Sequence, residues 1–297
     1  MENTTVVYYY QIVRYMQVSS AMLWVYDYIL TINREVSLIW GSQWSLMKIL
    51  FLVSRYSAVV DLPMALYYSM APHIAVKHCS RLHEAISWSI FVGISVAEVI
   101  LVVRTYALSG CNRYALFIFL FLWASGNCVC IVLVVLFFRS AVYEPSPFAG
   151  IPGCYLAAGN RVILTVPFIL VLVYDTIIMA YTLWLGINKH RHLKSPLKNI
   201  LYRDGITYYI VLFATSLLNV LILESPILPQ PATQGLGTHV FFFLLVFLSV
   251  MHSVLSTRII LHIRDVERWT RMESTAVLSE TDIVFRETRY PSRSNTT

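Results

Sequence analysis

Charged residues are scarce in this chain of 297 residues: Asp, Glu, Lys and Arg together make up 13%, about half of the roughly 25% found in soluble domains. Hydrophobic residues reach 58%. A soluble globular protein needs a charged surface that this composition cannot supply at the usual density. The same composition excludes a disordered chain, and five cysteines are too few for a disulfide-dense secreted scaffold. The composition therefore indicates an integral membrane protein.

Catalytic and metal-binding motifs are also missing from the sequence. It contains no P-loop, no H-E-x-x-H and no G-x-S-x-G, which would mark phosphate binding, zinc hydrolysis and nucleophilic catalysis. No C-x-x-C pair or zinc-ligand spacing occurs. The last apolar stretch has no lysine, which a retinal Schiff base would need. We therefore predict no catalytic residue, no cofactor and no metal, and a protein that is not an enzyme.

Seven long apolar stretches take the place of those motifs. Crossing the roughly 30 Å hydrocarbon core takes about 20 mostly apolar residues in a helix. The stretches are continuous rather than alternating, which favours helices over strands. They cover residues 11–32, 47–70, 85–108, 114–138, 161–186, 206–224 and 238–257. The sequence predicts an all-α fold, a seven-transmembrane helix bundle over residues 1–257.

The distribution of Lys and Arg predicts how the bundle is oriented. With the N-terminus outside, 16 of these residues lie on the inner side and 5 on the outer side, and Arg55 lies within a span. Such a bias favours the cytosol for the basic side. We expect the N-terminus out and the C-terminus in, in the plasma membrane or another membrane of the secretory pathway. The basic ends would contact anionic lipids of the inner leaflet, and no nucleic-acid partner is expected.

The segments outside the spans have distinct compositions. Residues 258–271 place apolar side chains at helical spacing between arginines, which predicts an amphipathic helix along the inner leaflet; a simple extension of the last span is the alternative. Residues 272–297 are rich in Ser and Thr, which predicts a disordered cytoplasmic tail. The basic loop 187–205 and the tail are candidate contacts for a cytosolic signalling partner. The outer loop 139–160 is rich in Pro and Gly, which predicts a non-helical lid.

Two candidate modifications fall on the predicted outer side. Cys79 and Cys154 both lie in outer loops, where the oxidising environment would allow a disulfide between them; two free thiols are the alternative. Asn3 begins an Asn-Thr-Thr sequon and is a candidate glycosylation site.

Ionisable residues inside the spans are the candidate functional residues. Each costs about 2.5–3.5 kcal/mol on insertion scales, so each suggests a site. One hypothesis is a polar latch, in which Arg55 pairs with Asp27 or Asp61 and holds the first two helices together. The other is a polar pocket, or an ion or proton path, around Asp61, Glu98 and Asp175. The two are compatible.

A family resemblance rests on motifs near the N-terminus. Asp27-Tyr28-Ile29-Leu30-Thr31 is followed by Glu35-Val36, Ile39-Trp40, Trp44-Ser45, Lys48, Leu50-Phe51 and Arg55-Tyr56. Over about residues 11–57 this pattern resembles the signature of the DUF6533 family, fungal and mostly basidiomycete multi-pass membrane proteins of unknown function. The resemblance supplies no activity. It implies that the following residues belong to a family pattern: Asp27, Tyr28, Thr31, Glu35, Trp40, Lys48, Arg55 and Tyr56. We interpret the segment as a helical hairpin whose short inner loop carries Glu35.

The predicted layout is shared by heptahelical receptors, so we expect a receptor-like sensor; this is an analogy of fold. A transporter or channel with a polar path through Asp61, Glu98 and Asp175 is the alternative. Transporters often contain internal repeats, and none is found in the sequence, which favours sensing. An intramembrane enzyme that uses His and Asp ranks third.

Overall fold

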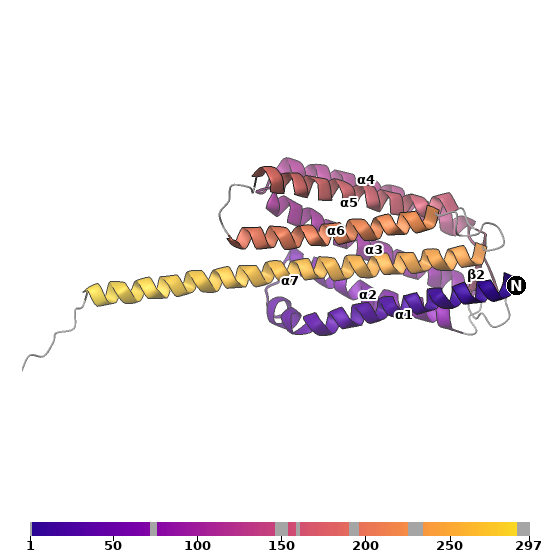
Figure 1. Cartoon of the computed structure of the whole chain (residues 1–297), viewed down its shortest axis with the longest axis horizontal. Helices are drawn as coiled ribbons and strands as arrows, with labels where there is room; N and C mark the ends of the chain where they lie inside the picture. The colour runs from indigo at the N-terminus through magenta and orange to yellow at the C-terminus, as the bar shows by residue number, and fades with distance from the viewer. Residues whose placement is uncertain are drawn as a thin grey trace, which may run out of the picture.

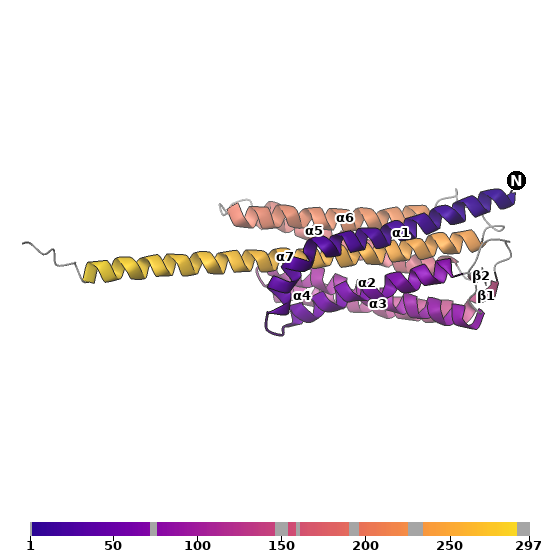
Figure 2. The same cartoon turned by 90° about the horizontal axis from the view of Figure 1, so that it is seen from below.

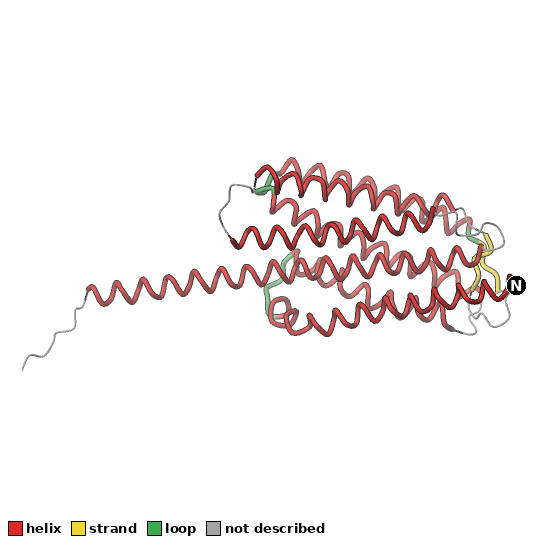
Figure 3. The backbone as a smooth tube through the Cα atoms, viewed as in Figure 1, coloured by secondary structure: helices red, strands yellow, loops and turns green. Residues whose placement is uncertain are grey.

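The computed structural model describes residues 2–71, 76–145, 154–158, 161–189, 196–224 and 234–289. Within these ranges the chain forms a bundle of long helices that lie side by side (Figures 1 and 3). The elements in chain order are α1 (Glu2–Glu35), η1 (Val36–Trp40), α2 (Leu46–Met70), α3 (Val76–Leu108), α4 (Arg113–Ser140), β1 (Val142–Pro145), β2 (Cys154–Ala158), α5 (Arg161–Lys189), α6 (Pro196–Glu224) and α7 (Gln234–Arg289). Here η1 is one turn of π-helix.

Five of the helices are long and apolar enough to cross a membrane within the described residues. They are Leu46–Met70, His78–Leu108, Arg113–Ser140, Thr165–Asn188 and Phe242–Trp269, and α6 adds a shorter apolar stretch, Tyr208–Ile222. The chain is therefore a membrane-embedded helical protein, and the expected helical fold is confirmed. Each of the seven apolar stretches lies within one of the helices. That all seven cross the membrane, and in which orientation, stays a prediction.

Helix α7 is the central helix of the bundle. It packs against α1, α2, α3 and α6. In its most apolar part 78% of the residues are buried, against 11% in the corresponding part of the peripheral α4. Small hydroxyl side chains let α7 approach α2 closely: Ser253 Oγ donates to the Ser54 carbonyl at 2.7 Å, and Ser256 Oγ lies 2.9 Å from Ser54 Oγ. Such small polar residues are typical of helix contacts in membranes.

The predicted outer lid contains an antiparallel hairpin. β1 pairs with β2, with Tyr143 opposite Leu156, at the end of the bundle where α1 begins (Figures 1 and 3). We call this end the hairpin end. The prediction of a non-helical segment agrees with the structure, but the composition gave no indication of strands. The residues between β1 and β2 lie outside the described part of the chain.

The C-terminal region differs from the prediction. Residues 258–271 form no separate helix along the membrane, since α7 continues straight to Arg289 and extends well beyond the other helices (Figures 1 and 2). The first turn of this segment packs on protein, because Ile259, Ile260 and Leu261 are buried, whereas Trp269 further along is exposed. Residues 272–289, expected to be disordered, are the last turns of this helix. Residues 290–297 lie outside the described residues.

Candidate functional site

Arg55 lies at the centre of a buried network between α1 and α2. Its Nε atom is 2.6 Å from Glu35 Oε2, and its Nη1 atom is 3.7 Å from Asp27 Oδ2. Its Nη2 atom donates a hydrogen bond to Thr31 Oγ1 at 2.6 Å. Only 1% of Arg55 is exposed. The guanidinium therefore joins three side chains of α1 to α2, which is the geometry a latch requires.

Glu35 is a main partner of Arg55, and it does not lie in a loop as expected. It is the last residue of α1 and is fully buried. Its Oε1 atom accepts hydrogen bonds from the Tyr56 hydroxyl at 2.8 Å and from Trp40 Nε1 at 3.1 Å. The wide turn of η1 returns Trp40 to Glu35. Lys48 secures the turn, because its Nζ donates to the carbonyls of Trp40 and Ser42 at 3.1 and 2.8 Å.

A second arginine, Arg258 of α7, completes the network. Its Nε atom donates to Asp27 Oδ1 at 2.5 Å. Asp27, Glu35, Arg55 and Arg258 form what we call the charged cluster, in which two acids face two bases. Sequence reasoning assigned Arg258 to a helix on the membrane surface and so missed it. Arg34 and Asp265 form a further ion pair between α1 and α7 close by.

Asp61 does not pair with Arg55, which was one of the two expected pairings. It is buried in α2, and its Oδ2 accepts a weak hydrogen bond from Ser249 of α7 at 3.4 Å. Ser89 of α3 is a second hydrogen-bond partner. Among the described residues, no ion pair includes Asp61. Arg55 pairs instead with Glu35 and Asp27 on α1. The latch therefore connects α2 to α1, whereas a pair with Asp61 would have stayed within α2.

Asp175 connects three helices on the other side of α7. Its Oδ2 accepts a hydrogen bond from Ser216 of α6 at 2.8 Å, and His252 Nε2 of α7 lies 3.9 Å from the same oxygen. Asp175 and His252 are 3% and 1% exposed. Asp175 is also within electrostatic range of Glu98. Glu98 and Asp175, which were expected to lie near each other, therefore do so. Asp61 lies between α2 and α7, where it contacts Ser249.

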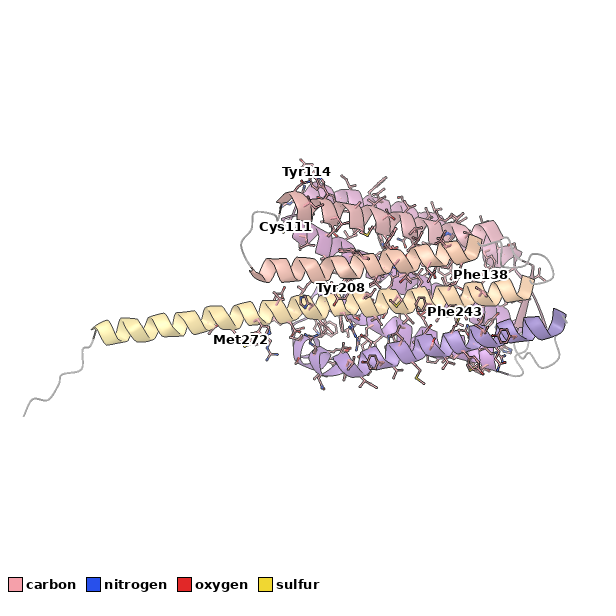
Figure 4. All side chains as sticks on the ribbon, viewed as in Figure 1. Cys111, Tyr114, Phe138, Tyr208, Phe243 and Met272 are labelled. Atoms are coloured by element: carbon pink, nitrogen blue, oxygen red, sulfur yellow. The ribbon has the colours of Figure 1, made fainter. Side chains whose placement is uncertain are left out.

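A cavity of about 330 Å³ lies between α3, α4 and α5, with α7 behind it. Its wall is mostly apolar, and Glu98 is the one carboxylate among the residues that line it. Of the three acids predicted to surround a polar pocket or path, Glu98 lines this cavity and Asp61 and Asp175 do not; a polar path through all three stays a prediction. The residues that line its hairpin end include His83, Phe137 and Phe138; Phe138 is labelled toward that end of α4 in Figure 4.

Beside Glu98, a ring of hydrogen bonds joins α3 to α4. Ser95 Oγ donates to Asn127 Oδ1 at 2.5 Å, and Asn127 Nδ2 donates to the Trp123 carbonyl at 2.8 Å. Trp123 Nε1 in turn donates to the Ser95 carbonyl at 3.2 Å. All three residues line the cavity. Sequence reasoning missed them, although an isolated polar residue such as Asn127 within the long apolar run of α4 is a usable signal.

The hairpin contacts the opposite end of the cavity. The Tyr143 hydroxyl of β1 lies 2.7 Å from His83 Nδ1, and the His83 ring packs edge-on against Phe137, Phe138 and Phe242. Burial, with a smaller effect from the charge of Glu84, raises the pKa of Tyr143 above its ordinary value. The phenol is therefore neutral at physiological pH, and its hydroxyl donates or accepts in this contact according to the tautomer of His83.

The cysteines and the sequon are the remaining candidates, and of them Cys130 lines the cavity. Cys79 is disulfide-bonded, and Cys111, Cys128 and Cys130 are free. The side chains of Cys154 and Asn3 lie outside the described residues, so the Cys79–Cys154 pairing and glycosylation at Asn3 stay predictions. Among the described residues, no group of three or more His, Cys, Asp or Glu side chains is placed to hold a metal ion.

Comparison with known families gives a match that contains three of the four residues of the charged cluster. Residues 15–60 match DUF6533, a family of unknown function. The resemblance seen in the sequence is therefore confirmed for this segment. No curated protein matches the chain. The DUF6533 segment contains Asp27, Glu35 and Arg55, whereas the cavity lies outside it. It also contains Tyr28, whose ring lies 4.9 Å from the Arg55 guanidinium carbon, so its signature residues contact one another.

Proposed function

We propose that this protein is a seven-helix membrane sensor that binds a small ligand in the cavity between α3, α4 and α5. The cavity is the observation that carries the proposal. Its volume of about 330 Å³ lies within the roughly 300–1,000 Å³ of ligand sites, and its lining of many apolar and few polar side chains is typical of them. We place the hairpin end and the N-terminus outside, and the C-terminus in the cytosol, on the distribution of Lys and Arg.

Helix α5 is the element through which a ligand would act. Pro167, Tyr174 and Ile177 of α5 line the cavity, and Asp175 on the same helix bonds Ser216 of α6. A ligand that binds two positions of α5 with different affinity shifts the population between them. Because Asp175 bonds to α6, such a shift would change how α5 and α6 are arranged. It would thereby move the basic segment 187–205, which was predicted as a loop but contains the end of α5 and the beginning of α6, since α5 ends at Lys189 and α6 begins at Pro196.

The inner end offers surfaces for a cytosolic signalling partner. The segment 187–205 is basic, and α7 extends beyond the other helices at this end (Figure 2). Basic residues here would also contact the anionic lipids of the inner leaflet. This arrangement suits the plasma membrane or another membrane of the secretory pathway.

Transport along Asp61, Glu98 and Asp175 is the competing hypothesis, and the positions of these acids favour sensing. A path needs polar groups that follow one another across the membrane. Only Glu98 lines the cavity, while Asp61 contacts Ser249 between α2 and α7. Vesicles of the purified protein would distinguish the two hypotheses, because a sensor shows no solute or proton flux that depends on Asp61 and Asp175.

A ligand screen with two matched glycine variants tests the proposed site. A Cβ atom at Gly126 or at Gly41 meets no other atom within 4 Å, and of the two only Gly126 lines the cavity. We expect compounds that raise the melting temperature of the purified protein to lose this effect in Gly126→Leu and to keep it in Gly41→Leu. Ligand-dependent crosslinking of the basic segment 187–205 to cytosolic proteins would test signalling. Compounds that stabilise both variants equally would show that the cavity is not the site.

A further inference from the structure

Within the part of the chain that the structure describes, the acids beside the cavity form no ion pair with lysine or arginine. In the charged cluster, Arg55 and Arg258 each lie within ion-pair distance of an acid. Among the described residues, Glu98 forms no salt bridge with Lys or Arg, and neither residue type lines the cavity. Asp175, which is within electrostatic range of Glu98, has His252 Nε2 at 3.9 Å and accepts a hydrogen bond from Ser216. A buried charge is stable only when it is paired or well hydrogen-bonded, so this region favours a positive charge from outside the protein.

Glu98 is placed to receive such a charge. It is 6% exposed and lines the cavity. Asn127 is its hydrogen-bond partner, and Asn127 is fixed in turn by Ser95 and the Trp123 carbonyl. The aromatic side chains of Trp123 and Tyr174 line the cavity as well, and aromatic faces attract cations at short range. A carboxylate in a cavity that is also lined by two aromatic residues is a suitable site for an ammonium group.

The rest of the cavity requires an apolar body. Phe91, Ile94, Leu133, Val134 and Phe137 form much of the wall. Along α3, His83 and Glu98 are about 22 Å apart at 1.5 Å per residue, so the carboxylate and the aromatic end near the hairpin are well separated. A molecule that satisfies both ends carries its charge at one end and hydrophobic groups along the remainder.

We propose that the ligand is an amphiphilic amine whose protonated nitrogen pairs with Glu98 and whose apolar body extends toward His83 and Phe137. This inference rests on the proposed function and adds the chemical class of the ligand. The nearby Asp175 strengthens the preference for a cation over an anion. A neutral alcohol would occupy the same apolar wall and would leave the carboxylate without a counter-charge.

Three probes with one hydrophobic body and different head groups test the ligand class. They are N,N-dimethyl-4-phenylbutylamine, 4-phenylbutanol and 4-phenylbutyrate, and binding to the full chain in lipid nanodiscs is measured by thermal shift and by tryptophan fluorescence. We expect the amine to bind at least tenfold more tightly than the alcohol, and the carboxylate to bind most weakly. Glu98→Gln should reduce the preference for the amine to less than threefold. Asp61→Asn, which removes a buried acid outside the cavity, should leave it at tenfold or more.

A labelling experiment on the unmodified protein makes the test independent of whether Glu98→Gln folds. Dicyclohexylcarbodiimide modifies carboxyl groups in apolar surroundings, and mass spectrometry locates the product. We expect the amine probe to slow modification of Glu98 at least fivefold and the alcohol to leave it unchanged. A wild-type protein that binds amine and alcohol equally, or a preference that survives Glu98→Gln, would overturn the amine proposal and leave the cavity as a ligand site. Failure of all three probes to bind would also overturn it, and the Gly126→Leu screen would then decide separately whether the cavity binds any ligand.

Discussion

Two regions of the bundle bury carboxylates in apolar helices, and they differ in how those charges are compensated. In the charged cluster, Asp27 and Glu35 face Arg55 and Arg258 at distances of 2.5 to 3.7 Å. Beside the cavity, Glu98 and Asp175 lie within electrostatic range of each other, and among the described residues neither forms an ion pair with arginine or lysine. Compensated charges hold helices together, whereas uncompensated charges are costly for a fold alone, so the second region is the one in which we expect function.

The charged cluster and the region beside the cavity also differ in how tightly their side chains pack. Around Arg55 the space is filled, because Ile39 and Phe51 are fully buried and the Tyr28 ring lies 4.9 Å from the guanidinium carbon. Between α3, α4 and α5 there is a cavity of about 330 Å³. The segment that matches DUF6533 covers the filled region and not the cavity. We infer that this segment builds the scaffold and that the ligand is selected by the helices that follow it.

The largest effect is expected from removing the central base of the charged cluster. Arg55→Leu would leave Glu35 and Asp27 buried with one base fewer, and loss of one partner of a buried ion pair costs about 3–5 kcal/mol. We expect a strong fall in melting temperature and in the amount of protein at the cell surface. Arg34→Leu is the matched control, since the Arg34 side chain is 55% exposed and such a pair contributes about 0–1 kcal/mol. Equal stability of the two variants would exclude a latch role for Arg55.

A pair of glycine substitutions tests the difference in packing. A Cβ atom at Gly93 would lie 2.7 Å from Ser57 Oγ, whereas at Gly126 it meets no atom within 4 Å. We expect Gly93→Ala to destabilise the protein by about 1–3 kcal/mol through overpacking. Gly126→Ala should be neutral or stabilise by up to about 1 kcal/mol, because Ala is the better helix former. Adding Ser57→Ala to Gly93→Ala should restore most of the lost stability. Thermal denaturation of the three single variants and this double variant measures the effect.

Much of the fold could be predicted because the membrane imposes simple rules on sequence. Helices must satisfy their own backbone hydrogen bonds in lipid, so continuous apolar runs predict helices, and the ends of α2 fall at residues 46 and 70 against the expected 47 and 70. The pairing of Arg55 with α1 was open to prediction as well, since a buried base in an apolar helix needs an acid.

Side-chain partners that come from distant segments could not be predicted. Glu35 looked like a loop residue because the sequence becomes polar after Thr31. Only the geometry of η1 brings Trp40 close enough to donate a hydrogen bond to Glu35. Arg258 resembled the other basic residues of the inner side until the burial of Ile259 and Ile260 placed its helix against the bundle. The cavity depends on how three helices pack against one another, so the pattern of apolar residues within any single helix does not predict it.

Removing the outermost base of the charged cluster should have a smaller effect than removing Arg55. Arg258 contacts the same carboxylate as Arg55, but its side chain is 40% exposed, and water therefore screens its charge. We expect Arg258→Met to cost about 1 kcal/mol, measured by thermal denaturation. A loss as large as that of Arg55→Leu would mean that the contact of α7 with Asp27 is as important as the contact between α1 and α2.

The smallest effect is expected at Asp175, and it tests the uncompensated side of the comparison directly. Asp175→Asn removes a charge that has no arginine or lysine partner among the described residues and keeps a carbonyl oxygen for the bond from Ser216. We expect a change in stability within about 1 kcal/mol of zero, in contrast to the charged cluster, because no buried partner loses its counter-charge. A loss of several kcal/mol would instead identify His252, 3.9 Å away, as a protonated partner, and His252→Gln would then cause a similar loss. In that case the two regions would share one principle of charge pairing, and only Glu98 would remain uncompensated.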